Sequence, residues 1–385
     1  MEYSYGATMN IAILGAVWGD EGKGAITHHM SKDYDWVVRF GGGANAGHTI
    51  YRDGVKYVHN LLPSVDFRHK HIKSYLGAGM VIDLEKLRDE VLEAEKHYPG
   101  VASTIYVDKD AFLVTKKHKE EDAATNAHIG STNRGIGPAY KDKVGRCGYR
   151  VGDLFYGGLF EGCMPLGTLA VELVKLGVHF KYVMEMEEEF KASNILFEGA
   201  QGVLLDINHG IYPYVSSSDC CASGIVSSGF GFVKLAKVYG VAKAYTTKVG
   251  AGPFPTEYHD KEAEDLRELG NEYGATTGRP RRVGCIDLPA LKYACKKGGI
   301  TDLIITKFDI LNNLGKVKMC LSYKEDPFCG SDFFKAEPIY SNMKGWTTKN
   351  KDELHYFINA VEKITGIDVQ YISWGTDPED IIKWH

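Results

Sequence analysis

The segment of residues 15–24, GAVWGDEGKG, has the residue types of a phosphate-binding loop. Glycines directly after a strand let backbone N–H groups turn toward phosphate, and a helix beginning behind them adds its positive dipole end. Lys23 supplies a point charge for a terminal phosphate. The segment is not a Walker A loop, because Val17 replaces its first glycine and Gly24 replaces its Ser or Thr. Asp20 lies inside the loop, where repulsion from phosphate is costly unless it binds a cation or moves a proton.

A second glycine cluster, GGGANAGHT at residues 41–49, follows the apolar run Trp36–Phe40. Its glycines permit close approach of the backbone to a ligand. Asn45, His48 and Thr49 are then its polar side chains. A histidine in this setting can donate to a phosphoryl oxygen or act as a general acid.

Two further segments carry arginine beside glycine and hydroxyl residues. Residues 130–137, GSTNRGIG, suit a monophosphate, and Lys143, Arg146 and Arg150 follow them. Residues 274–282, GATTGRPRR, place three arginines after two threonines. Guanidinium groups bind carboxylates at two points, so this segment is a candidate binding loop for a dicarboxylic acid.

Thr306-Lys-Phe-Asp309 follows a short apolar run and suits recognition of guanine. The carboxylate of Asp309 can accept hydrogen bonds from N1–H and the 2-amino group of guanine, a pair that adenine lacks. The alternative interpretation is an ordinary solvent-facing Lys and Asp at the end of a strand.

Short apolar runs alternate with helical patterns along the chain, which predicts an α/β fold. The predicted buried strands are Met9–Leu14, Trp36–Phe40, Asn194–Phe197, Val241–Thr247 and Leu303–Thr306. The two clearest predicted helices are Leu84–His97, with Asp83 as N-cap, and Asp352–Thr365, with Gly366 as its stop.

We therefore predict a single large domain over residues 1–385, with a central, mostly parallel β-sheet flanked by helices and a P-loop-like phosphate loop after the first strand. Residues 156–193 are expected to be a helical excursion from the sheet, and residues 1–8 a disordered N-terminal extension.

Composition narrows the class of protein further. Of 385 residues, 44% are hydrophobic and 25% charged, which excludes wholesale disorder. The net charge of -5 and the lack of a basic run argue against a nucleic-acid partner, and no apolar stretch is long enough to span a membrane. The first residues lack the pattern of a secretory signal. The 8 cysteines include no C-x-x-C pair, so we expect reduced thiols and a cytoplasmic protein.

Together these segments resemble the adenylosuccinate synthetase family, ligases of purine synthesis. The resemblance covers most of the chain, in the order of the family's motifs. The matches are G-D-E-G-K-G at 19–24, N-A-G-H-T at 45–49, R-G-I-G-P-A-Y at 134–140, F-E-G-A-Q-G at 197–202, V-G-A-G-P-F-P-T-E at 249–257, G-A-T-T-G-R at 274–279 and T-K-x-D at 306–309.

The resemblance implies ligation of L-aspartate to C6 of IMP, with hydrolysis of GTP to GDP and phosphate, through a 6-phosphoryl-IMP intermediate. By the same resemblance, Asp20 removes the N1 proton, while His48 and Lys23 act on the phosphoryl group. Mg²⁺ is bound by Asp20 and the carbonyl of Gly47. Arg146 is expected to reach the active site of the second subunit of a homodimer.

The resemblance also implies three sets of binding residues. The purine nucleotide is assigned to Asp20, Glu21, Gly22, Lys23, Asn45, Ala46, Gly47, His48, Thr132, Arg146, Gln201, Ser216 and Arg279. Aspartate is assigned to Ala275, Thr276, Thr277, Gly278, Arg279 and Arg281. GTP is assigned to Gly19, Glu21, Gly22, Lys23, Gly24, Gly47, His48, Thr49, Arg281, Lys307, Phe308, Asp309, Ser373, Trp374 and Gly375.

The chain departs from the common bacterial pattern near both nucleotide sites. Ala25, Ala44, Asn133 and Ser216 replace other residues, and residues 373–376, SWGT, replace S-T-G-P. These changes motivate an alternative, the viral 2-aminoadenylosuccinate synthetase, which uses dGMP in place of IMP and ATP or dATP as donor, in a host cytoplasm.

We favour IMP and GTP because the loop keeps its aspartate, where viral forms resemble a Ser variant, and because T-K-F-D suits guanine. A non-catalytic GTP-binding switch is a distant alternative, and it has no use for the loop at 274–282.

Overall fold

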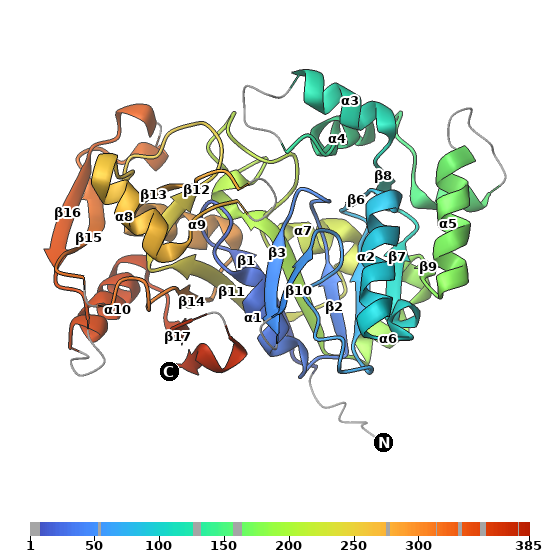
Figure 1. Ribbon diagram of the computed structural model, residues 1–385, viewed down its shortest axis with the longest axis horizontal. Coiled ribbons are helices and arrows are strands. Elements are labelled where there is room, and N and C mark those ends of the chain that lie inside the picture. Colours follow the sequence, from blue (N-terminus) through green and yellow to red (C-terminus); the bar gives the residue numbers. More distant parts are fainter. Residues whose placement is uncertain are drawn as a thin grey trace.

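The computed structural model describes residues 8–52, 55–125, 132–156, 164–274, 278–312, 314–329, 333–346, 352–375 and 377–385. The predicted N-terminal extension, residues 1–8, lies outside this part except for Thr8. Figure 1 shows a central sheet with helices on its two faces, which is the predicted architecture.

Within the described residues, the main sheet has ten strands in the order β18-β17-β14-β11-β1-β10-β2-β5-β7-β9. Its neighbouring pairs are parallel except for the antiparallel pair of β17 and β18 at one edge. The strands are β1 (Asn10–Gly15), β2 (Trp36–Arg39), β5 (Lys73–Leu76), β7 (Ile105–Asp108), β9 (His179–Lys181), β10 (Ile195–Gly202), β11 (Leu235–Lys243), β14 (Asp302–Thr306), β17 (Val369–Ser373) and β18 (Ile381–Lys383).

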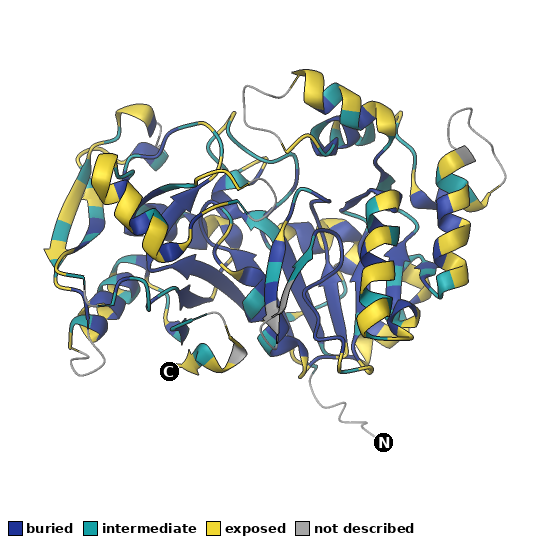
Figure 2. Ribbon diagram, in the orientation of Figure 1, coloured by how far each residue is buried: buried dark blue, intermediate teal, exposed yellow. Residues whose placement is uncertain are grey.

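Strands β1, β2 and β14 are buried along their whole length, and Figure 2 shows the buried interior of the sheet. Helices cover both faces of a parallel sheet, so its strands read as continuous apolar runs rather than alternating ones. This is why the apolar runs were recognisable in the sequence. The predicted strands at Met9–Leu14, Trp36–Phe40 and Leu303–Thr306 are confirmed with one-residue differences at their ends. The strand predicted at Asn194–Phe197 is also present, but it continues to Gly202 as β10.

Helices α2 and α10 each bury one apolar stripe. Both helices with predicted bounds are confirmed: Asp83 accepts the N-cap hydrogen bond of α2 from the backbone of Lys86, and Gly366 follows α10 with a φ of 76°. The described helices are α1 (Lys23–Ser31), α2 (Leu84–His97), α3 (Lys116–Thr125), α4 (Ile136–Gly145), α5 (Met164–Leu176), α6 (Glu187–Lys191), α7 (Ser223–Ile225), α8 (Asp260–Gly270), α9 (Leu288–Gly298) and α10 (Asp352–Thr365). None of the described helices has the length and apolar character needed to cross a membrane.

A smaller sheet, in the order β12-β13-β15-β16, lies beside α8 and α9 (Figure 1). The prediction of one strand over Val241–Thr247 is wrong, because the chain leaves the main sheet at Ala244 and continues as β12 in the smaller one. Its strands are β12 (Tyr245–Lys248), β13 (Arg282–Asp287), β15 (Val317–Tyr323) and β16 (Pro338–Met343). The remaining strands pair in twos: β3 (His48–Arg52) with β4 (Val55–His59), and β6 (Val81–Ile82) with β8 (Phe112–Leu113).

The region from 156 to 193 is not simply a helical excursion. It contains α5 and α6, but β9 between them pairs with β7 and forms an edge of the main sheet. Residues 157–163 lie outside the described part.

The chain segments that follow β1, β2, β10, β14 and β17 leave the sheet at the carboxyl ends of these parallel strands. This edge faces the α3–α4 pair and the smaller sheet in Figure 1. Ligands of open α/β sheets bind outside the carboxyl ends of the strands, so the fold brings the glycine-rich segments to the expected place.

Candidate active site

The phosphate-binding loop joins β1 to α1, and Gly22 caps the helix with a φ of 94°. The carboxylate of Glu21 points into this loop. It accepts hydrogen bonds from the backbone N–H of Val17 (3.1 Å) and Gly19 (2.7 Å) and lies 2.8 Å from Nζ of Lys23. A Cβ on Gly15 would lie 2.5 Å from that carboxylate, so only glycine fits there. Glu21 is therefore internal to the loop, and its predicted contact with nucleotide is limited to its backbone.

Asp20 stands on the exposed side of the same loop, with a positive φ of 61°. Its Oδ2 forms an ion pair with Nε of Arg281 at 2.8 Å. Arg281 also binds the buried carboxylate of Glu272 at 2.7 Å, and Glu272 receives Nζ of Lys243 at 2.7 Å. Burial acts to raise the pKa of Glu272, but the charges of Lys243 and Arg281 outweigh it and lower that pKa to about 2. The loop carboxylate is thus tied to the segment that carries the three arginines.

His48 is the first residue of β3 and lies at the end of the second glycine cluster. Its Nδ1 is 2.6 Å from Oε1 of Glu198, a fully buried residue of β10. The backbone N–H of Ser64 donates to the other oxygen of Glu198 at 2.9 Å. Burial opposes ionisation of Glu198, yet the charges of His48 and Arg39 lower its pKa to about 2. Nε2 of His48 has one long contact, 3.4 Å from the carbonyl oxygen of Ala200, and lies at the cavity wall where a ligand could replace that contact.

A cavity of about 630 Å³ lies between these loops. Its wall includes side chains from the phosphate loop, the second glycine cluster, α3, α4 and the end of β12. Fourteen of the residues expected in the site line it: Gly19, Asp20, Gly22, Lys23, Gly24, Asn45, Ala46, Gly47, His48, Thr49, Thr132, Gln201, Ser216 and Arg281. Oδ1 of Asn45 is buried and has no hydrogen-bond partner among the described residues, so it is available to a ligand.

The residues expected to bind guanine meet at a separate place, where β14 and β17 end side by side. The backbone N–H of Phe308 donates to the carbonyl of Ser373 at 3.1 Å, and the hydroxyl of Ser373 donates to the carbonyl of Gly375 at 2.9 Å. Oδ1 of Asp309 is buried and lacks a hydrogen-bond partner within the described part of the chain. Burial raises the pKa of this carboxyl.

This second place is connected to the phosphate loop. The hydroxyl of Thr306 donates to the carbonyl of Glu21 at 2.8 Å, and Nζ of Lys307 donates to the carbonyl of Gly270 at 3.3 Å. Phe308 is fully buried against Trp346, Phe357 and Trp374. The Phe308 side chain therefore packs in the core beside the proposed guanine site. Only its backbone is left for the expected contact with GTP.

Several expected residues lie elsewhere. Arg146 is exposed at the end of α4, with a φ of 60°, and does not line the cavity of its own chain. Arg279 and Gly278 are exposed and also lie off the cavity wall. Three of the residues predicted to bind the substrate aspartate lie outside the described part of the chain: Ala275, Thr276 and Thr277.

The departures at Ala44 and Asn133 do not alter the cavity wall. Ala44 is packed into the core beneath the loop with 2% of its surface exposed, and Asn133 is exposed outside the cavity.

Two functional residues were missed from the sequence. Glu198 stands inside the matched motif F-E-G-A-Q-G, and a single charged residue in an otherwise apolar strand was the available signal. Lys248 ends β12 and lines the cavity, but a lone lysine after a strand carries no distinctive pattern.

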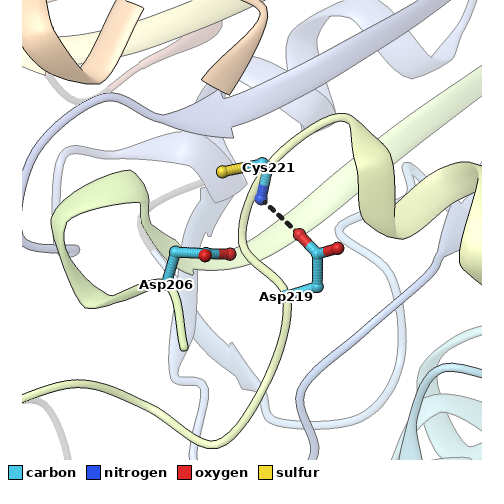
Figure 3. A group of neighbouring side chains, drawn as sticks. All are labelled: Asp206, Asp219 and Cys221. Atoms are coloured by element: carbon cyan, nitrogen blue, oxygen red, sulfur yellow. Dashed lines mark hydrogen bonds between the residues drawn. The ribbon is translucent and has the colours of Figure 1, made fainter. Parts of the chain in front are cut away.

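Asp206, Asp219 and Cys221 lie close together near the cavity (Figure 3). Asp206 accepts hydrogen bonds from the backbone N–H of Asn208, His209 and Cys220, each between 2.6 and 2.9 Å. Asp219 accepts from the backbone of Cys221 at 3.0 Å. Because these carboxylates hold backbone donors, the cluster braces the loop that carries Ser216.

The fold and the cavity are typical of α/β enzymes with a glycine-rich, phosphate-binding type of loop before the first helix. The adenylosuccinate synthetase family model matches residues 12–164 and 165–382. The chain belongs to the adenylosuccinate synthetase family, and it is a carbon–nitrogen ligase of purine biosynthesis, as the motifs predicted.

Curated relatives and solved structures of this family match nearly the whole length of the chain. Adenylosuccinate synthetase from Petrotoga mobilis is 46% identical over 408 residues, which cover 96% of each chain. The structure of the fully ligated adenylosuccinate synthetase from Plasmodium falciparum is similar with a TM-score of 0.87 and 32% identity, covering 99% of this chain and 100% of that one.

A succinoaminodeoxyadenylate synthetase of cyanophage S-2L, bound to dGMP and dATP, is similar with a TM-score of 0.70, covering 98% of this chain and 95% of that one. Its identity is 22%, so this likeness shows the fold alone. The comparisons favour the cellular enzyme over the viral alternative.

Proposed function

We propose that the chain joins L-aspartate to C6 of IMP, with GTP as phosphoryl donor and Mg²⁺ as cofactor. The observation that carries this proposal is the position of Asp20 and His48 in one cavity, beside the amino end of α1. Asp20 is placed to accept a proton, and His48 is placed to donate a hydrogen bond to charge that develops on a phosphoryl group.

In the first step the carboxylate of Asp20 takes the N1 proton of IMP, which makes O6 nucleophilic. O6 then forms a bond to the γ-phosphorus of GTP as the bond to the GDP oxygen breaks. Nε2–H of His48 donates to the phosphoryl oxygens in the protonated form of the ring, whose Nδ1–H donates to Glu198 at 2.6 Å and fixes the ring. Lys23 and the N–H groups at the start of α1 stabilise the same oxygens.

In the second step the amine of aspartate attacks C6 and phosphate leaves with the former O6. The three arginines at 279–282 support binding of the two carboxylates of aspartate. Of these, Arg281 lines the cavity, 2.8 Å from Asp20. The acid substrate is therefore expected beside the residue that activates the purine.

The residues present fit a magnesium ion. Asp20 and Gly47 both line the cavity, and carboxylate and carbonyl oxygens are the hard ligands that Mg²⁺ prefers. Such an ion supplies positive charge to the phosphoryl oxygens. Since Asp20 is paired with Arg281 here, the guanidinium must share or leave this carboxylate when a cation binds.

Asn45, Thr132, Gln201 and Ser216 line the cavity and are proposed to hold IMP. We propose that Arg146 acts on the IMP of a second subunit in a homodimer. Its exposed position outside its own cavity supports this assignment. The separate site at the ends of β14 and β17 is proposed for guanine, supported by the unpartnered Oδ1 of Asp309. We place the reaction in the cytoplasm, where its phosphorylated substrates are retained.

The test is phosphate release with aspartate and Mg²⁺, crossing IMP or dGMP with GTP or ATP. Turnover with IMP and GTP is expected, and dGMP should not replace IMP. Turnover with dGMP and ATP alone would contradict the proposal and assign the chain to the 2-aminoadenine reaction.

A further inference from the structure

Lys248 is a buried lysine in the cavity wall to which no step above gives a role. It is the last residue of β12, and 2% of its surface is exposed. Its Nζ lies 3.7 Å from the centroid of the Trp18 ring, and Trp18 belongs to the phosphate loop. Both residues line the cavity. The lysine therefore presents its ammonium from one wall of the active site while an aromatic face holds it in place.

No carboxylate compensates this charge among the described residues. The carboxylate whose charge acts on Lys248 is that of Glu257. Arg282 binds both of its oxygens, with 2.7 Å from Nε to Oε1 and a second short contact from Nη2. Arg282 itself lies opposite Lys248 in the β12–β13 pair. The described surroundings of the Lys248 ammonium are therefore the ring of Trp18 and the like charge of Arg282.

A buried charge without a partner is costly, so it is kept where something else compensates it. Burial, followed by the charge of Arg282, lowers the pKa of Lys248 to about 7. An anion that enters the cavity would offset both the burial of the ammonium and its repulsion from Arg282. The environment of Lys248 is thus one that favours an anionic ligand over water.

We propose that Lys248, supported by Trp18, forms an anion-binding subsite of the cavity that holds an anionic oxygen of a substrate. This inference rests on the proposed function. The carboxylate of aspartate is the favoured source, because Arg282, which lies opposite Lys248 in the strand pair, is the last residue of the arginine segment assigned to the dicarboxylic acid. A phosphoryl oxygen of either nucleotide has the same chemistry, and the two sources are separated by experiment.

The primary test measures the KM of aspartate, IMP and GTP for Lys248→Met, which keeps the aliphatic length and removes the charge. The KM of aspartate is expected to rise about tenfold or more, as for loss of a hydrogen bond to a charged group. If the KM of IMP or GTP rises and that of aspartate does not, the subsite is supported and its ligand is a phosphoryl oxygen. Unchanged KM values for all three substrates, in a folded variant, overturn the proposal.

Two further variants separate charge from packing. Lys248→Arg should restore part of the affinity, and Trp18→Leu should weaken the same substrate as Lys248→Met because it removes the platform. The matched control is Lys297→Met, since Lys297 also lies over a ring, that of Tyr293 at 5.7 Å, but is exposed on α9. Lys297→Met should leave all three KM values unchanged.

Binding without turnover keeps this test independent of the proposed reaction. Succinate and inorganic phosphate, which cannot complete ligation, are titrated onto the wild-type protein and Lys248→Met after ¹³C-methylation of lysines, with detection by NMR. The resonance that is missing in Lys248→Met should move with one of these anions. If the wild-type protein fails to turn over IMP but this resonance still responds, the proposed function fails and the subsite stands. A resonance that responds to neither anion counts against the subsite itself.

Discussion

Nδ1 of His48 lies 2.6 Å from a carboxylate oxygen of Glu198, and the two residues come from strands that are far apart in the sequence. The backbone N–H of Ser64 occupies the other oxygen at 2.9 Å. This arrangement fixes the position and orientation of the histidine in the cavity wall. We propose that Glu198 is a positioning residue, which acts through His48 and does not itself touch substrate.

Glu198→Gln should lower kcat about 10- to 100-fold while changing the KM of GTP little, because an amide no longer provides the charged acceptor that holds Nδ1–H of His48 and orients its ring. This split between kcat and KM is a readout that a purely structural role would not move.

Glu90→Gln is the matched control for that variant. Glu90 is also a buried carboxylate, and it holds the backbone N–H of Asn60 and Leu62 at 3.0 Å, outside the cavity. It should affect stability alone. Equal losses of kcat in Glu198→Gln and Glu90→Gln would show that Glu198 acts only through folding.

Asp20→Asn should abolish turnover while the fold is kept, because the amide cannot accept the N1 proton of the purine. Single-turnover assays with IMP and GTP, without aspartate, report this step directly. Asp302→Asn serves as control. Asp302 is the first residue of β14, at the end away from the proposed site, and its carboxylate pairs with Lys237 at 2.6 Å. An Asp20→Asn enzyme with an unimpaired rate would exclude the role of base.

Sequence patterns located most elements that position these residues. The 3.6-residue spacing and the cap at Asp83 defined α2 with its observed bounds, and continuous apolar runs defined β1, β2 and β14. The run Val241–Thr247 was misjudged because neither glycine nor proline marks the point at Ala244 where one strand ends and another begins. Strand β9 has only three residues, too few for a periodic signal.

The family resemblance, rather than local spacing, implied that the phosphate loop, the second glycine cluster and Arg281 belong to one site, and all three line the cavity. The contacts between these segments could not be predicted from the sequence. The pairs Asp20–Arg281 and His48–Glu198 join residues whose distance in the sequence carries no pattern, and they follow only from the order of strands in the sheet. Likewise, Glu21 lies beside Asp20 in the sequence, yet its side chain turns inward to bind Lys23.

Arg146→Leu should raise the KM of IMP by a factor of about 10 or more, since it removes a charged contact that we assign to the second subunit. The KM of GTP should change less. Mixing Arg146→Leu with Asp20→Asn is decisive, because each hybrid dimer then has one site with both residues intact. Random exchange should restore about a quarter of wild-type activity. No recovery on mixing would place Arg146 in its own subunit's site or outside the mechanism.

The pair of Glu272 with Lys243 and Arg281 predicts how stability depends on pH. The pKa of Glu272 is lowered from 4.5 to about 2, since the charges of Lys243 and Arg281 outweigh burial. The folded protein therefore binds fewer protons at this site than the unfolded chain, and the ionised carboxylate stabilises the fold above pH 4.5. This contribution is lost as the pH falls from 4.5 toward 2.

Glu272→Gln should accordingly lower the free energy of unfolding by about 3–5 kcal/mol at neutral pH, because it leaves Lys243 buried without its partner. Denaturant unfolding at several pH values measures this, and the difference from wild type should shrink as the pH approaches 2. Glu262→Gln removes the half-exposed partner of Lys318 and should cost less than about 1 kcal/mol. In Glu272→Leu with Lys243→Met, both charges are gone and part of the stability should return. A Glu272→Gln protein as stable as wild type at pH 7 would mean that the network does not stabilise the site.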